Sequence, residues 1–425
     1  MTGAAPKEPW RERMRAVGPG ILFAGAAIGV SHLVQSTRAG AGYGFNLLWA
    51  VLLVLLFKYP FFQFAHRYTV ASGESLLEGY RRLGTWALVA FMTIVTLSSF
   101  ITTAAVTIVT AGLAGALLGL DLSLTWLSLG LLVVIAIMLS AGHYRLLDTG
   151  MKVMVLILGI LTLVAVAVAF AHGPAGDPRW VDPALWSAGG VTFLLALMGW
   201  MPAPLDIGAW SSLWILEKHR GDVTRPSRAQ AMLDFNLGYA ATVVLAVAFL
   251  SFGALVMHGT GVEFSASGLV FSQQLIEMYT GTLGAWTRPV IALVAFITMF
   301  STTLTVMDGY SRTLGSGLLL LAGRGGAEGA APRRKLYHLF LVLQLVLAVL
   351  IIGRFIQGMQ ALVDVATVVA FLTAPLVAVL NLRVMFLETV PRAARPAAAM
   401  IWYCRAGIVF LVGFGLVWIY TRWFI

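Results

Sequence analysis

The chain has 425 residues, of which 60% are hydrophobic and only 11% are charged, and its mean hydropathy is +0.90. Because soluble proteins carry roughly 25% charged residues, a soluble fold of this length could not cover its surface. The composition therefore excludes a string of soluble domains. It predicts an all-α polytopic membrane protein whose main partner is the lipid bilayer.

The net charge of +10 could indicate a nucleic-acid partner, but the distribution of the basic residues indicates topology instead. If the N-terminus is cytoplasmic, 22 of the 28 lysine and arginine residues fall on the cytoplasmic side of the predicted spans. This asymmetry follows the positive-inside rule. We expect no nucleic-acid partner, and an integral protein of a bacterial inner or plasma membrane with an external C-terminus.

Eleven apolar spans are long enough to be transmembrane helices. In chain order they are residues 18–39, 46–65, 86–118, 124–141, 149–171, 190–216 (interrupted), 233–257, 289–311, 336–353, 359–382 and 405–421. A cytoplasmic tail of residues 1–17 precedes them, and a short surface helix is expected around Ser272–Tyr279. The sequence contains no phosphate-binding loop, no H-E-x-x-H zinc motif and no dinucleotide fingerprint, so we expect no enzyme activity and no bound cofactor.

Two of the spans are interrupted near their centres. Span one contains Gly29-Val30-Ser31-His32, and span six contains Met201-Pro202-Ala203-Pro204-Leu205-Asp206, whose prolines cannot donate backbone hydrogen bonds. Non-helical backbone at membrane depth is tolerated where it is buried or lines a wet cavity. Breaks at corresponding positions of two five-helix halves are typical of inverted-repeat transporters. The predicted repeats are residues 18–172 and 189–384, with an external loop at 173–188 between them and a linker and eleventh helix at 385–425.

The stretch Gly18–Phe45, GPGILFAGAAIGVSHLVQSTRAGAGYGF, resembles without gaps the first helix of the Nramp family of proton-coupled divalent-metal transporters. The opening GPG, Ala39–Ala41 and Tyr43-Gly44 are in register, and NLLWAVLL (Asn46–Leu53) is similar to the second helix of the family. Met201-Pro202 resembles the start of the Met-Pro-His motif in helix six. The resemblance implies a leucine-transporter-type fold with a 5+5 inverted repeat, broken helices 1 and 6, and an appended eleventh helix.

The chain departs from this family at the residues that the resemblance would make metal ligands. The Asp-Pro-Gly-Asn motif of the family falls on Gly29, Val30, Ser31 and His32, so its carboxylate is missing. Met201 keeps the thioether of the helix-six motif, whereas Ala203 replaces the histidine. The acid of helix three that moves protons in the family falls near Val106, in a threonine-rich stretch (Thr102, Thr103, Thr107 and Thr110). The resemblance therefore indicates a divergent branch with altered ligands and uncertain proton coupling.

Asp206 is the acidic residue beside a break, and intramembrane acids are functional candidates by default. One hypothesis is that it faces the cavity as a substrate ligand or proton carrier and compensates for Gly29. The other is that it caps the second half of helix six at Ile207. His32 is the one histidine at a break, and its imidazole could bind substrate, a metal or a proton.

The complete predicted substrate site is Gly29, Ser31, His32, Gln35, Met201, Ala203 and Asp206, with His32, Met201 and Asp206 as candidate metal ligands. His32, Asp206 and Asp308 are the candidate proton carriers. Lys58 is expected to extend its ammonium group to the membrane surface. Asp364 is expected to be solvated near an external helix end.

Three functions fit these residues. The first is a secondary transporter that moves a divalent metal ion by alternating access. The second is a transporter of a non-metal small solute or anion, because a site without a carboxylate on helix one favours a neutral or negative substrate. The third is a receptor or sensor that has kept the fold but does not transport. The sequence does not specify the oligomeric state.

Overall fold

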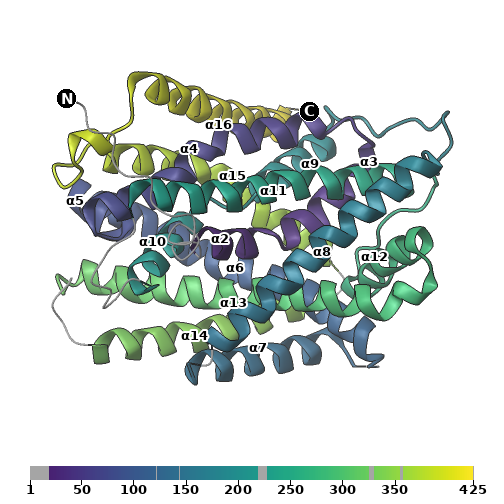
Figure 1. Ribbon diagram of the computed structural model, residues 1–425, viewed down its shortest axis with the longest axis horizontal. Coiled ribbons are helices and arrows are strands. Elements are labelled where there is room, and N and C mark those ends of the chain that lie inside the picture. Colours follow the sequence, from purple (N-terminus) through teal and green to yellow (C-terminus); the bar gives the residue numbers. More distant parts are fainter. Residues whose placement is uncertain are drawn as a thin grey trace, which may run out of the picture.

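The computed structural model describes residues 19–120, 122–142, 144–218, 227–324, 330–354 and 358–424. Within these ranges the secondary structure is helical, and no strand occurs. The long helices lie side by side along the long axis of the molecule (Figure 1). The predicted tail of residues 1–17 lies outside the described residues.

The helices follow the predicted spans closely. Helix 1 consists of α2 (Pro19–Ala27), a π-helical turn η1 (Ser31–Ser36) and α3 (Thr37–Tyr43). It is followed by α4 (Leu48–Ser72), α5 (Leu76–Leu83), α6 (Thr85–Leu118), α7 (Leu124–Ser140) and α8 (Tyr144–His172). Helix 6 consists of α9 (Ala188–Gly199) and α10 (Ile207–Lys218). The remaining elements are α11 (Arg228–Val256), α12 (Gly268–Leu283), η2 (Ala285–Thr287), α13 (Arg288–Leu321), α14 (Ala330–Arg354), α15 (Met359–Val384), η3 (Arg392–Ala394) and α16 (Ala398–Phe424).

The predicted membrane architecture is confirmed. Each of the eleven predicted spans contains a helix, and in the described part of the chain eight helices are long and apolar enough to cross a bilayer. The interruptions in helices 1 and 6 occur where the sequence predicts them, and α12 is the expected short helix. The sequence analysis missed α5, whose eight residues are too few for an apolar span.

Local side-chain chemistry sets several helix ends. Ser75 and Ser227 each begin a helix with a reciprocal capping box, in which the serine hydroxyl accepts from the third residue of the helix and that residue's side chain accepts from the serine N–H. Ser187 caps α9 by accepting from Gly190 N–H. Gly73 ends α4 and Gly119 ends α6 in the left-handed conformation that glycine adopts without strain.

Both halves of helix 1 pack closely on α11. A Cβ added to Gly40 of α3 would lie 1.9 Å from the carbonyl oxygen of Leu250, and one added to Gly253 would lie 2.3 Å from that of Thr37. A real Cβ could not approach a carbonyl oxygen this closely, so both positions require glycine. Small residues allow membrane helices to pack closely in the same way. The first half is packed as closely, because a Cβ added to Gly20 of α2 would lie 2.2 Å from the carbonyl oxygen of Asp234 of α11.

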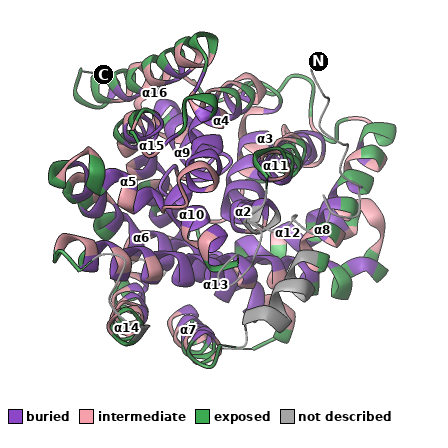
Figure 2. Ribbon diagram, turned by 60° about the vertical axis from the view of Figure 1, so that its left-hand side comes forward, coloured by how far each residue is buried: buried purple, intermediate pink, exposed green. Residues whose placement is uncertain are grey.

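The outer helices expose apolar side chains where a soluble protein would expose polar ones. Leu97, Leu156 and Val409 are 64%, 63% and 70% exposed. Figure 2 shows the buried residues concentrated on α2, α6, α10 and α13 in the middle of the bundle, with exposed residues on the outward faces of α7, α14 and α16. This arrangement is the one expected when lipid is the solvent.

Replacing Gly40 with alanine tests the contact between α3 and α11. We expect Gly40→Ala to lower the stability by about 1–3 kcal/mol, because its Cβ overlaps the Leu250 carbonyl. Gly42→Ala in the same helix is the matched control, since nothing lies within 4 Å of its added Cβ. The measurement is the thermal unfolding midpoint of the detergent-solubilised protein. Equal midpoints for the two variants would contradict the predicted close approach.

Candidate functional site

The two helix breaks meet at a small cavity in the centre of the bundle, which we call the central cavity. Its volume is about 30 Å³. Helix 1 contributes Val30 and Ser31, and helix 6 contributes Pro202 and Ala203, while Thr102 of α6 and Thr302 of α13 complete its polar surface. The predicted breaks therefore lie against each other, although 170 residues of chain separate them.

Asp206 lines a second cavity of about 10 Å³, the Asp206 cavity, which shares Thr102 and Pro204 with the central cavity. Its Oδ2 accepts hydrogen bonds from Tyr310 at 3.1 Å and from Ser98 at 3.4 Å. Its Oδ1 is buried and has no hydrogen-bond partner among the described residues. A buried carboxylate oxygen without a partner is costly, and a cavity of this size holds about one water molecule or ion.

The break in helix 1 is packed against α13. A Cβ added to Gly29 would lie 2.5 Å from Oγ1 of Thr302, so this position has no room for a larger side chain. The Ser31 hydroxyl, which lines the central cavity, donates to the carbonyl of Ala27 at 2.6 Å. Position 29 therefore has no carboxylate, and the Thr302 side chain occupies the space that such a side chain would need.

His32 faces α11 and does not line the central cavity. Its side chain is fully buried, and Nε2 lies 3.0 Å from the Thr242 carbonyl oxygen of α11. Its Nδ1 lies 2.7 Å from the Ser31 hydroxyl. The imidazole thus joins the helix 1 break to α11, and it reaches the cavity only through Ser31. Its predicted role as a substrate or proton ligand stays a prediction.

Met201 and Gln35 also lie away from the lining of the central cavity. Met201 is completely buried, while the next three residues of helix 6 form the cavity wall. Gln35 points toward α15, where its amide donates to Asp364 at 3.0 Å. Of the seven predicted substrate-site residues, Ser31 and Ala203 line the central cavity, Asp206 lines the adjoining one and Gly29 contacts its wall.

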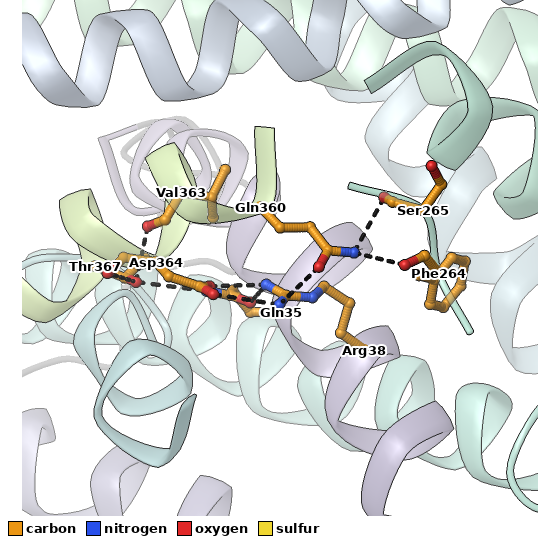
Figure 3. Close-up of polar contacts among 8 residues, drawn as sticks. All are labelled: Gln35, Arg38, Phe264, Ser265, Gln360, Val363, Asp364 and Thr367. Atoms are coloured by element: carbon orange, nitrogen blue, oxygen red, sulfur yellow. Dashed lines mark hydrogen bonds and ion pairs between the residues drawn. The ribbon is translucent and has the colours of Figure 1, made fainter. Parts of the chain in front are cut away.

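Gln35, Arg38, Gln360 and Asp364 form a polar cluster, the Arg38 network, near the α12 end of the bundle (Figure 3). The Arg38 guanidinium donates to both Asp364 oxygens, at 2.7 and 3.3 Å, and to Gln35 Oε1 at 2.8 Å. Gln360 donates to the carbonyls of Phe264 and Ser265, which precede α12. The expectation that Asp364 is simply solvated is wrong, because Arg38 pairs with it.

The Arg38 network connects elements from both predicted repeats. Arg38 belongs to α3 of helix 1, and Asp364 belongs to α15. The guanidinium also lies 5.0 Å from the centre of the Phe193 ring of α9. A cavity of about 530 Å³ borders this network, with Arg38, Gln360 and Asp364 in its wall. The network therefore forms part of the wall of this larger cavity.

Lys58 of α4 does not extend to the membrane surface, so the sequence-based expectation for it is wrong. Its side chain is fully buried, and Nζ donates to the carbonyls of Met198 and Gly199 at 2.7 Å each and to that of Ala203 at 3.4 Å. These carbonyls lie at the break of helix 6, where regular helical hydrogen bonding ends. The non-helical backbone of helix 6 thus provides hydrogen-bond acceptors inside the protein, and the Lys58 ammonium group donates to them.

Asp308 lies at a third place, toward the α5 end of α13. It forms an ion pair with Arg312 at 2.7 Å and accepts hydrogen bonds from Trp214 and Tyr337. Arg312 and Tyr337 line another cavity of about 530 Å³. Asp308 therefore links α10, α13 and α14, and it does not line the central cavity or the Asp206 cavity.

Tyr310 and Ser98 were not predicted, although they hold the Asp206 carboxylate. Neither stands beside a break, so the sequence carries no signal for them. Of the four threonines of α6, Thr102 lines both cavities, whereas Thr103 bonds to Gln344 and Thr110 to Thr303. Only part of the threonine-rich stretch thus belongs to the site.

The described residues contain no group of three or more histidine, cysteine, aspartate or glutamate side chains close enough to hold a metal ion. The two cavities at the breaks are lined by the carboxylate of Asp206, by hydroxyl groups and by apolar side chains. Chemically, such a lining can hold one small ion or polar group, with oxygen atoms as the available ligands.

Two solved structures share this arrangement of helices. A crystal structure of a mutant manganese transporter from Eremococcus coleocola matches with a TM-score of 0.68 at 16% identity, covering 99% of this chain and 89% of that one. The structure of MhsT in complex with L-phenylalanine matches with a TM-score of 0.63 at 12% identity, covering 95% and 98%. These similarities show the leucine-transporter-type fold.

Sequence comparison gives the family. An uncharacterized protein of Pasteurella multocida is 36% identical over 422 residues, which cover 99% of this chain and 95% of that protein. Metal transporter Nramp6.2 of Populus trichocarpa is 35% identical over 72 residues, or 17% of this chain and 13% of that protein. The model of the natural resistance-associated macrophage protein-like family matches residues 20–421. The chain therefore belongs to the Nramp family of membrane transporters and is not an enzyme.

Proposed function

We propose that this chain is a secondary transporter that moves a small ion by alternating access through the central cavity and the Asp206 cavity. The observation that carries this proposal is the meeting of the two helix breaks at buried cavities with a partly unpaired carboxylate. Transporters with discontinuous helices bind their substrates between such half-helices. Membership in the Nramp family supports the same class of function.

The size of the cavities favours an ion over an organic solute. The central cavity is about 30 Å³ and the Asp206 cavity about 10 Å³. Sites for drug-sized organic ligands measure roughly 300–1,000 Å³. A dehydrated ion fits the central cavity without movement of the helices.

We propose a divalent metal ion as the substrate, with Asp206 as its anionic ligand. The relatives named as manganese or metal transporters support this class. A divalent cation gives up its water only to anionic or strongly dipolar oxygen ligands. Asp206 supplies the charge that Gly29 lacks, and its unpartnered Oδ1 is available for coordination.

A non-metal small anion or solute is the second candidate. The observation in its favour is the buried ammonium group of Lys58 at the break of helix 6, which repels a second cation. No carboxylate occupies the break of helix 1 to offset it. A receptor that binds substrate without transporting it is the third reading, and flux measurements separate it from both.

Replacing Asp206 tests the metal hypothesis. We expect Asp206→Asn to lower the uptake of Mn²⁺ into proteoliposomes by about tenfold or more, because a charged ligand is lost. Glu277→Gln is the control, since Glu277 is an exposed acid of α12. The panel includes Mn²⁺, Mg²⁺, Ca²⁺ and small organic solutes, with isothermal titration of each ion.

Uptake of an organic solute or anion without any response to the divalent ions would replace the metal with the second candidate. Binding without flux would favour the receptor. Equal Mn²⁺ uptake by the Asp206→Asn protein and the Glu277→Gln control would exclude Asp206 as a ligand.

We further propose that the Arg38 network closes one side of the transporter, and that this side is external. The charge distribution supports a cytoplasmic N-terminus, which puts α3 and the loop before α12 outside. We also propose residues 18–172 and 189–384 as the repeats that move relative to each other. Proton coupling through His32, Asp206 or Asp308 would appear as uptake driven by a pH gradient, and a uniporter would not respond to it.

Opening of this closure can be measured with a single introduced cysteine. In a Cys404→Ser background, which removes the one native cysteine, Ser31→Cys reports access to the central cavity. We expect Arg38→Gln to speed its modification by an impermeant thiol reagent added outside by about tenfold, because the ion pair with Asp364 is lost. Arg422→Gln is the control, since Arg422 lines the same outer cavity. An unchanged rate in the Arg38→Gln protein would show that the network does not limit access.

A further inference from the structure

Lys58 is a buried cation in the middle of a membrane-spanning helix. It lies near the centre of α4 (Leu48–Ser72), and none of its side chain is exposed. Its ammonium group forms hydrogen bonds to carbonyl oxygens only, with Met198 and Gly199 each at 2.7 Å and Ala203 at 3.4 Å. The acidic residue of the same break is Asp206, at the end of the Met201–Asp206 segment.

The carbonyls that receive Lys58 lack the N–H partner four residues further along that a regular helix provides, although the Met198 carbonyl also accepts from Met201 N–H at 3.4 Å. The last carbonyls of a helix have no N–H four residues further along to accept from. Here α9 ends at Gly199, and Pro202 and Pro204 within the break cannot donate at all. Because no water in the hydrocarbon region can replace these donors, the freed oxygens need a partner inside the protein.

A cation suits this position for two physical reasons. The C-terminal end of a helix carries a partial negative charge, which stabilises a positive group. Converging backbone carbonyls are also the ligands that hard cations accept. In transporters with broken helices, the C-terminal ends of half-helices coordinate the coupling cation.

We propose that the Lys58 ammonium group is a tethered cation that permanently occupies a cation site at the C-terminal end of α9. It holds the carbonyls on both sides of Trp200 together, where a free sodium or metal ion would otherwise bind. Lys58 is therefore a specificity-determining residue: its charge lowers the affinity of the helix 6 break for additional cations. This inference rests on the proposed function, because it concerns the same broken helix.

The proposal differs from a simple packing role for the lysine. A packing role requires the shape of the side chain, whereas a tethered cation requires its charge. Lys58 and Asp206 are opposite charges at the same break of helix 6, since the ammonium group reaches the Ala203 carbonyl and Asp206 follows three residues later. Removing Lys58 leaves an empty carbonyl site beside a carboxylate, so the break becomes attractive to cations from solution.

Chemical rescue separates charge from shape. Lys58→Ala removes three methylene groups and the ammonium group, which together correspond to n-propylammonium. We expect the purified variant to unfold at a lower temperature than the wild type, and millimolar n-propylammonium to raise its midpoint by about 3 °C or more. The neutral molecule 1-propanol, of the same shape, should not restore it. Lys335→Ala removes an exposed lysine of α14 and is the control, which we expect neither compound to stabilise.

A second variant applies if Lys58→Ala does not fold. The amide of Lys58→Gln can still donate to two carbonyls but carries no charge. We expect this protein to bind Na⁺ and Mn²⁺ at least tenfold more tightly than the wild type in isothermal titration. The Lys335→Gln protein should bind them as the wild type does.

The proposal is overturned if n-propylammonium and 1-propanol stabilise the Lys58→Ala protein equally. It is also overturned if Lys58→Gln leaves the cation affinities at their wild-type values. Both measurements use binding and unfolding in detergent, so they do not depend on flux. Absence of transport in the wild type would contradict the proposed function and leave the assignment of Lys58 to be decided by these results.

Discussion

The fold depends on one constraint: a polypeptide that leaves the helical conformation inside a membrane must find partners for its backbone groups within the protein. Helix 6 leaves the helical conformation between Gly199 and Ile207, and helix 1 between Ala27 and Ser31. The Lys58 ammonium group satisfies the carbonyls at the first of these breaks. Water and lipid cannot do so at this depth. The central cavity, the Asp206 cavity and the buried side chains of Lys58 and Asp206 all lie around these two interruptions.

Three groups of charged side chains lie at different places in the bundle. The Arg38 network joins helix 1, α15 and the segment before α12 at one end of the bundle. Asp206 and Lys58 lie at the centre, and the Asp308–Arg312 pair joins α13 to α10 and α14 at the other end. Each of these groups joins helices that are distant in the sequence, so together they contribute to holding the bundle along its length.

The sequence predicted which segments are helices but not how each helix is rotated. Hydropathy and the interruptions at Gly29–His32 and Met201–Asp206 were sufficient for the spans and the two breaks, and the resemblance of Gly18–Phe45 was sufficient for the family. The side chains of a broken helix point in several directions, however, and the local sequence does not indicate which of them face the cavity. His32 turned out to face α11, and Lys58 to face helix 6, because the acceptors they use come from chain segments 140 or more residues away. Tyr310 carries no local signal and is identified only by its contact with Asp206.

The contact between Gly29 and Thr302 makes these two positions interdependent. Because the space beside Gly29 is filled by the threonine of α13, an aspartate introduced at 29 alone would collide with it before it could reach any ion. Thr302 must therefore be replaced by a smaller residue before an aspartate is introduced at position 29. That first replacement by itself only enlarges the central cavity. The carboxylate of the wider family can thus be restored to this branch only by an ordered pair of substitutions. The size of the side chain that position 29 can accept therefore depends on α13 as much as on helix 1.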